Sequence, residues 1–330
     1  MEYFLPSLHS IGALIPGLMS LSLALFLLFK KDKTTPTVWL GGMFLGYASL
    51  FFGYFASYTF FHEVAAYHRI FSVAIVFGLW AMIGFSYTYP RNVHIREFKI
   101  VMPLTFIIAL GGWAHFVVAT WNMEKYFQFD AHLYTFLFGR EASLVILLLM
   151  FFFLQILLRK ALLFSEYKGP LYYWTKTGGL ARRIVGRFLL FWHKLVLPRG
   201  RDARACRDFF LGGIFMVIVG VLNALQKSGR LSYDTYGILF GTITILAFFY
   251  IFLVYINNSP EPTTFMVKLV GISAVALLLV FSLGSYITLY LNEAAYDRER
   301  LTEVRSERTL ILRGEFQEVS PAIQYVMVRP

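Results

Sequence analysis

The stretch YHRIFSVAIVFGLWAMIGFSYT, residues 67–88, decides the fold class of this chain. No charged side chain occurs between Arg69 and Arg91. A helix of roughly 20 mostly apolar residues is long enough to cross about 30 Å of hydrocarbon. Reading outward from this stretch, we find seven further runs of the same kind. The sequence therefore predicts an eight-helix transmembrane bundle with spans at about 6–29, 37–60, 67–88, 101–121, 134–158, 209–226, 235–256 and 266–291.

The composition of the whole chain supports lipid as its solvent. Of the 330 residues, 58% are hydrophobic and 15% are charged, whereas globular domains have about 45–50% and about 25%. We therefore expect an all-α integral membrane protein. The formal net charge of +11 does not indicate nucleic-acid binding, because the positive residues sort into loops.

The distribution of Lys and Arg between the loops predicts the orientation. The odd-numbered loops carry 19 of these residues and the even-numbered loops carry four. Because cytoplasmic loops are enriched in Lys and Arg, we expect the odd loops in the cytoplasm. With eight spans, both termini then lie outside a bacterial inner membrane.

Small residues predict close helix packing in two spans. Gly42, Gly46, Ser49 and Gly53 form a stripe in the second span, and Gly220 with Ala224 repeats the pattern in the sixth. Small side chains let a neighbouring backbone approach closely inside a membrane.

The fifth loop, residues 159–208, is too long for a simple connector. Its segment LARRIVGRFLLFWHKLVL, residues 180–197, predicts a basic amphipathic helix with Phe and Trp on its apolar face. Such a helix is typical of segments that lie on an anionic leaflet. The alternative is a solvated loop whose helix packs under the bundle. The basic residues of the predicted surface helix are Arg182, Arg183, Arg187 and Lys194.

Polar residues in the outer third of the spans predict a ligand-binding pocket, because ionisable groups within a membrane are costly. Arg140 and Glu141 are expected about 9–10 Å below the outer end of the fifth span at 1.5 Å per residue. The alternative is a structural role, as hydrogen-bonded bundle residues or as side chains that reach the headgroups. The candidate residues are His9, Arg69, His115, Arg140, Glu141 and Asn223.

No catalytic motif and no paired intramembrane carboxylates occur in the sequence, so we do not expect an enzyme. Cys206 is the single cysteine, which excludes an internal disulfide and a Cys-based zinc site. A haem would need two His side chains at matched depth; His9 and His115 could in principle supply them, but no paired His spacing within one helix supports a haem. We therefore predict no metal and no cofactor.

The chain resembles the seven-helix N-terminal sensor region of bacterial histidine kinases, and more closely versions fused to membrane cyclases and sporulation-E-type protein phosphatases. The resemblance rests on LSLALFLLFKK (21–31), AAYHRIFSVAIVFG (65–78), FSYTYPRN (85–92), AYDRERLTEVRSERTLILRGEF (295–316) and PAIQYVMVRP (321–330). It implies a seven-helix sensor domain at 1–262, an eighth helix at 263–292 and an extracytoplasmic α/β domain that begins at 293–330 and is truncated. The family supplies no ligand residues that map onto positions here.

We therefore expect a non-enzymatic sensory module that relays a signal to an output domain absent from this chain. The expected partners are the lipid bilayer, an unidentified small-molecule or lipid ligand, and a second copy in a homodimer. A transporter or channel is the alternative function, and a membrane enzyme or haem protein is a third.

Overall fold

A computed structural model describes residues 8–60, 62–128, 133–136, 140–166 and 180–258, with isolated positions from Ser273 to Thr302. The chain divides into two compact units, Met1–Ser282 and Leu283–Pro330. The first unit holds the elements described below. In the second unit, every described position is helical.

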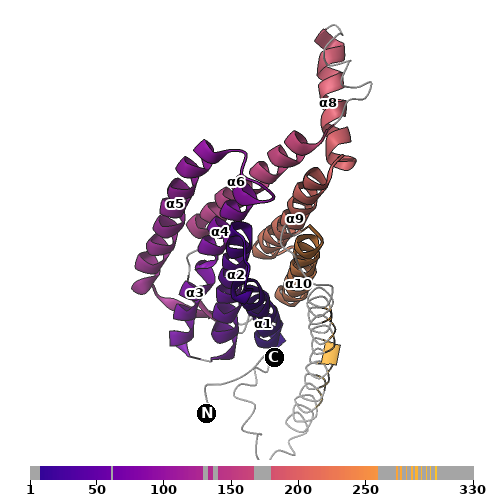
Figure 1. The fold of residues 1–330 in the computed structure, drawn as a ribbon. Helices are drawn as coiled ribbons and strands as arrows, with labels where there is room; N and C mark the ends of the chain where they lie inside the picture. Colours follow the sequence, from indigo (N-terminus) through magenta and orange to yellow (C-terminus); the bar gives the residue numbers. More distant parts are fainter. Residues whose placement is uncertain are drawn as a thin grey trace, which may run out of the picture. The chain divides into compact units, whose positions relative to one another are not determined.

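The first unit is a bundle of long helices, drawn in Figure 1. Seven segments of the described chain are long and apolar enough to cross a membrane, so the chain is a multi-pass membrane protein. Its helices and strands are α1 (Leu8–Phe29), α2 (Thr35–Thr59), η1 (Glu63–His68), α3 (Arg69–Val73), α4 (Ile75–Thr88), α5 (Ile95–Trp121), β1 (Lys125–Gln128), β2 (Leu133–Phe136), α6 (Arg140–Phe164), α8 (Leu180–Val196), α9 (Arg201–Lys227) and α10 (Tyr233–Asn258).

Seven of the eight predicted spans are confirmed as apolar helices. The eighth, at 266–291, lies outside the described residues except for single positions that are helical. The α/β segment predicted at 293–330 is not supported, because its only described positions, Ala295, Arg298 and Thr302, are helical, and the rest lies outside the described residues.

The predicted bounds of the fifth span are wrong by six residues. Residues 133–136 form strand β2, which pairs antiparallel with β1, and the helix begins at Arg140 and ends at Phe164. The helix continues past Arg159 and Lys160 because both cations find partners on neighbouring elements, as described below. The end of the apolar run at residue 158 therefore does not predict where helix α6 ends.

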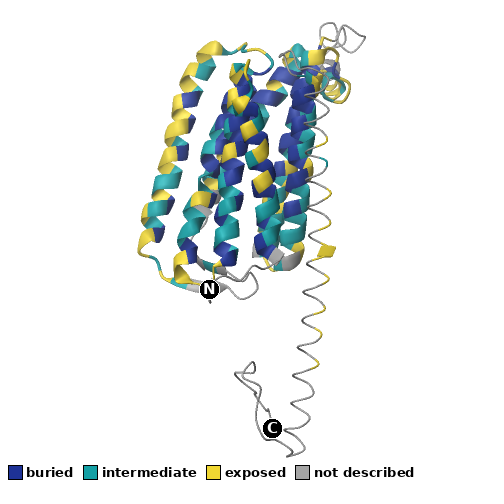
Figure 2. Cartoon of the chain, turned by 60° about the horizontal axis from the view of Figure 1, so that its bottom comes forward, coloured by how far each residue is buried: buried dark blue, intermediate teal, exposed yellow. Residues whose placement is uncertain are grey.

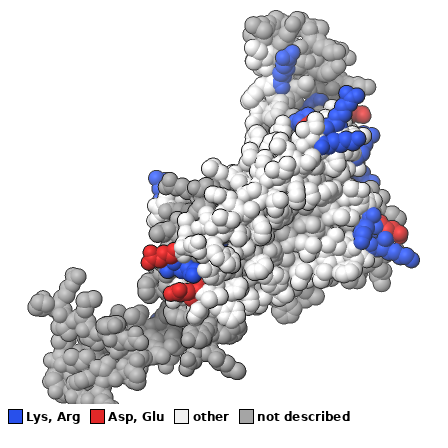
Figure 3. Space-filling model, turned by 90° about the vertical axis from the view of Figure 1, so that its left-hand side faces the viewer, with Lys and Arg blue, Asp and Glu red and all other residues white. Residues whose placement is uncertain are grey.

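Six of the described helices form a ring, and α5 and α8 lie outside it. Around the ring, α2 packs on α1 and α4, α6 packs on α4 and α9, and α10 packs on α9 and α1, whereas α5 packs on α3, α4 and α6. We call the end that carries η1 and the β1–β2 hairpin the hairpin end. The opposite end carries Lys30–Lys33 and α8, and we call it the basic end. On the face drawn in Figure 3, Lys and Arg side chains gather toward the basic end, and a smaller group lies beside acidic side chains at the other end.

The small-residue stripe of α2 is confirmed as a close contact with α3 and α4. A Cβ atom on Gly46 would lie 2.4 Å from the Cα of Gly78, and one on Gly53 would lie 2.5 Å from the Ser72 Oγ. Ser49 donates a hydrogen bond to the Phe71 carbonyl at 2.8 Å. The backbones of these helices therefore approach as closely as small residues allow.

The corresponding prediction for α9 is wrong for the described part of the bundle. Gly220 and Ala224 are exposed, and a Cβ atom on Gly220 would meet nothing within 4 Å. The pattern in α9 is therefore not a contact with another described helix. Close packing of α9 instead uses Gly213, where an added Cβ would lie 2.4 Å from the Phe153 ring on α6.

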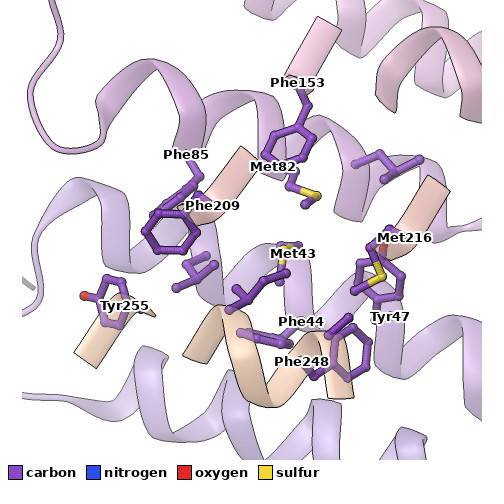
Figure 4. Packing of buried hydrophobic residues seen from close by; sticks show 14 of the residues in the cluster. Met43, Phe44, Tyr47, Met82, Phe85, Phe153, Phe209, Met216, Phe248 and Tyr255 are labelled. Carbon is purple, nitrogen blue, oxygen red and sulfur yellow. The ribbon is translucent and has the colours of Figure 1, made fainter. Parts of the chain in front are cut away.

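The core of the bundle is apolar and rich in aromatic rings. Figure 2 shows buried residues facing the interior, while much of α5 is exposed on its outer side. In Figure 4 the rings of Phe44 and Phe248 lie beside Tyr47. The Phe248 ring contacts the rings of Phe44 and Tyr47 edge to face, with centroid distances of 5.4 Å and 4.9 Å.

Candidate functional site

Polar aromatic side chains from three helices gather at the hairpin end. His9 comes from the first turns of α1, Tyr54 and Tyr58 from the last turns of α2, and Tyr233 and Tyr236 from the first turn of α10. We call these five residues the tyrosine cluster.

His9 is the buried centre of the tyrosine cluster. Its side chain is 8% exposed, and its ring lies 5.1 Å from the Tyr233 ring and 5.6 Å from the Tyr58 ring. The hydroxyls of Tyr58 and Tyr233 share a hydrogen bond. Tyr54 stacks on Tyr58 with the two planes 15° apart. The cluster thus joins α1, α2 and α10 through groups that can both donate and accept hydrogen bonds.

Arg69 is linked to the tyrosine cluster through Tyr236. It is half-buried in the first turn of α3, and its guanidinium interacts electrostatically with Tyr236 on α10. Two of the six predicted site residues, His9 and Arg69, are therefore brought to the same group of side chains.

The other four predicted residues are not brought to this cluster. His115 is exposed on α5, in the same stripe as the exposed Ile107 and Val118. Asn223 is half-buried on α9. Arg140 and Glu141 occupy the first turn of α6 rather than a position deep in the span, and their side chains lie outside the described residues. A single pocket lined by all six residues is therefore not supported.

The two histidines considered for haem do not face each other. His9 is buried between α2 and α10, whereas His115 is exposed on α5, which packs on α3, α4 and α6. Within the described ranges, no three His, Cys, Asp or Glu side chains lie together as metal ligands would.

Aromatic rings extend from the tyrosine cluster along the interface of α2 and α10. Tyr54 and Tyr236 both contact Phe240, which packs 5.4 Å from Phe51. Phe51 contacts Phe248, which contacts Tyr47 and Phe44. Toward the basic end, the buried hydroxyls of Thr37 and Tyr255 share a hydrogen bond of 2.6 Å. We call Phe44, Tyr47, Phe51, Phe240 and Phe248 the aromatic column.

A buried lysine holds the basic end together. Lys160 on α6 is completely buried, and its Nζ donates hydrogen bonds to the carbonyls of Ser86 at 3.0 Å, Tyr87 at 2.9 Å and Tyr89. These carbonyls lie at the end of α4, where no helical N–H groups remain to bind them. Hydrogen bonds to three backbone carbonyls therefore replace the hydrogen bonds that the Lys160 ammonium would make with water.

Tyr89 continues this junction toward α10. Its hydroxyl donates a hydrogen bond to the Asn258 carbonyl at 3.1 Å. Burial raises the pKa of the Tyr89 phenol well above its ordinary value, because a phenolate would lose its hydration. The group stays protonated and remains a donor.

A second polar contact joins α4, α5 and α6, and it is made by Arg159, the residue before Lys160. Arg159 donates two hydrogen bonds to the Glu97 carboxylate, at 2.8 Å and 3.2 Å. The Tyr87 hydroxyl donates to the same carboxylate at 2.8 Å. The pairing satisfies both charges where the helices meet the basic end.

The predicted amphipathic helix in the fifth loop is confirmed as α8. Arg187 is exposed on it, and Lys194 is half-buried and donates a hydrogen bond to the Leu162 carbonyl at 3.2 Å. Arg182 and Arg183 lie in α8, but their side chains are outside the described residues.

Sequence reasoning missed the four tyrosines and Lys160. Tyr54 and Tyr58 are four residues apart and Tyr233 and Tyr236 are three apart, spacings that place each pair on one helix face. Lys160 has no such signal, because a Lys beside Arg159 at the start of the predicted fifth loop is typical of the cations in a cytoplasmic loop.

No protein-family model, curated protein or solved structure matches this chain.

Proposed function

We propose that this protein is a non-enzymatic membrane sensory module. A signal molecule binds at the tyrosine cluster, the packing of α1, α2 and α10 changes, and the bundle passes the change to an output component. The hairpin end faces the outside in this proposal. The observation that carries it is the tyrosine cluster itself, in which three helices meet through polar rings.

The chemistry of the cluster supports a switchable contact. Tyrosine hydroxyls and an imidazole can exchange hydrogen bonds with each other for hydrogen bonds with a ligand. A ligand shifts a conformational equilibrium only when it binds one state better than the other. A ligand that competes for the Tyr58–Tyr233 hydrogen bond would favour the state in which α2 and α10 separate at this end.

The aromatic column supports a physical route by which a change in packing passes from the hairpin end to the basic end. Close-packed interiors move between discrete packings rather than deforming continuously. A rotation of α10 against α2 at the hairpin end would therefore move the Thr37–Tyr255 contact at the basic end.

The composition of the column also favours a sensor over the alternative of a transporter or channel. A conduction path needs polar groups along its length. The described rings between the tyrosine cluster and the Thr37–Tyr255 hydrogen bond are apolar, apart from Tyr47.

A binding screen tests this proposal. The full chain in lipid nanodiscs is heated with a library of amino acids, organic acids, nucleosides and fatty acids. A ligand present at 100 times its Kd stabilises the folded state by about 2.7 kcal/mol, which raises the melting temperature by a measurable amount. We expect at least one compound whose stabilisation is lost in Tyr58→Phe and Tyr233→Phe.

Tyr250→Phe is the matched control, because Tyr250 lies on α10 but contacts Phe215 rather than the tyrosine cluster. Stabilisation that survives both cluster variants would contradict the proposed site. Movement of the same compound into sealed proteoliposomes would contradict the sensor and favour a transporter.

A further inference from the structure

Helix α8 presents an apolar face that no described part of the bundle covers. Seven large hydrophobic side chains on or next to this helix are exposed by 40% to 63%: Ile184, Val185, Phe188, Leu189, Trp192, Val196 and Leu197. A soluble surface rarely leaves so many apolar side chains together. We therefore expect this apolar face to contact another molecule or the membrane.

The rings of this face form a group of their own. Trp192 packs edge to face against Phe188 at 6.2 Å and against Phe191 at 5.9 Å. Trp is enriched in the headgroup region of a bilayer, and Trp with Phe is typical of the apolar face of helices that lie there.

Cationic residues lie on the side of α8 that is turned away from the apolar face. Arg187 is exposed, and helical register places Arg183 one turn before it on the same side. Between these two sides of the helix, Gly186 is buried. Lys194 fastens the last turn of α8 to α6 through its hydrogen bond to Leu162.

The position of α8 in the sequence determines how far it lies from the membrane. It lies between α6 and α9, which both span the membrane and which end and begin at the basic end. Because α9 begins at Arg201, the C-terminal end of α8 at Val196 is held near one membrane surface, which brings its apolar face within reach of lipid.

We propose that α8 lies in the headgroup region of an anionic leaflet, with Phe188 and Trp192 inserted toward the acyl chains and its arginines bound to lipid phosphates. Charge complementarity decides the occupant, because a helix with one apolar face and a cationic polar face matches an acidic lipid surface. A second copy of this chain would bring a second set of cations to the same place. This inference does not depend on a ligand at the tyrosine cluster.

Site-directed spin labelling tests the proposal on the full chain. Cys206 is the only cysteine and is buried, so a Cys206→Ala chain supplies the background. Single cysteines replace Phe188 on the apolar face and Arg187 on the cationic side, and each carries a nitroxide. The two sites are neighbours, so each controls for the folding of the other.

In nanodiscs of 70% phosphatidylcholine and 30% phosphatidylglycerol, we expect the Phe188→Cys label to be several-fold more accessible to oxygen than to a water-soluble nickel chelate. The Arg187→Cys label should show the reverse order. In phosphatidylcholine alone, the contrast between the two labels should shrink by at least half.

Three results would overturn the proposal. Both labels could be open to the nickel chelate, which would place α8 in water. Both could be closed to each reagent until unlabelled chain is added, which would indicate a second copy. The contrast could also be equal in the two lipid mixtures, which would remove the role of lipid charge.

A charge variant gives an independent readout. The Arg182→Gln, Arg183→Gln, Arg187→Gln chain leaves the Lys194–Leu162 contact in place. We expect it to lose the dependence on phosphatidylglycerol measured with the Phe188→Cys label. Retention of the full lipid dependence would assign it to other cations of the basic end and contradict the role of α8.

Discussion

Lys160 illustrates what a single buried residue contributes to this fold. An ammonium group inside a protein is unfavourable unless hydrogen bonds replace its hydration. Here three carbonyls at the end of α4 supply those bonds, and the same carbonyls would otherwise lack donors. The residue and the helix end therefore stabilise each other.

We expect Lys160→Met to destabilise the protein strongly. The side chain keeps its length but loses all three donors, and each buried acceptor left unsatisfied costs about 1–3 kcal/mol. Thermal unfolding in nanodiscs measures the loss. Lys99→Met is the control, since Lys99 is exposed on α5; equal melting temperatures for the two variants would show that the three hydrogen bonds do not matter.

At the scale of elements, close approach of α2 to α4 depends on paired glycines. Gly46 and Gly78 face each other with no room for a methyl group. Within lipid, helix association relies on such van der Waals contact rather than on the hydrophobic effect. The glycines are therefore part of the contact and not merely tolerated.

Gly46→Ala and Gly111→Ala should change stability in opposite directions. An added methyl at Gly46 forces the helices apart, and overpacking costs typically about 1–3 kcal/mol. At Gly111 on α5 an added Cβ meets nothing within 4 Å, so alanine should stabilise the helix by roughly 0.5–1 kcal/mol. Melting temperatures of the two variants provide the comparison, and a stabilised Gly46→Ala chain would contradict the observed packing.

At the scale of the whole molecule, charge separates the two ends. The basic end carries the Lys30–Lys33 turn, Arg91 and α8, whereas the hairpin end has few cations. Because Lys and Arg are retained on the cytoplasmic side, the tyrosine cluster is expected to face outward. This orientation is required if the cluster is to meet an external signal.

Cysteine labelling of intact cells tests the orientation. We expect a membrane-impermeant maleimide to react with Glu124→Cys at the hairpin end, and to react with Lys31→Cys at the basic end only after permeabilisation. Both native side chains are exposed, so access to the reagent depends only on the side of the membrane. The reverse pattern would place the tyrosine cluster in the cytoplasm and remove the basis for an external signal.

The amino-acid sequence determined the solvent of this protein, seven of its spans, the tight stripe of α2 and the amphipathic nature of α8. Each of these is a local property, since transfer into lipid adds up residue by residue along one segment. Only the tertiary structure decided that His9 contacts Tyr58 and Tyr233, that His115 is exposed on α5 and that Lys160 is buried. The spans are apolar on every side, so their sequences carry little record of which face meets a neighbour and which meets lipid. The rotation of each helix, and with it the partners of each polar side chain, is decided by packing against the others.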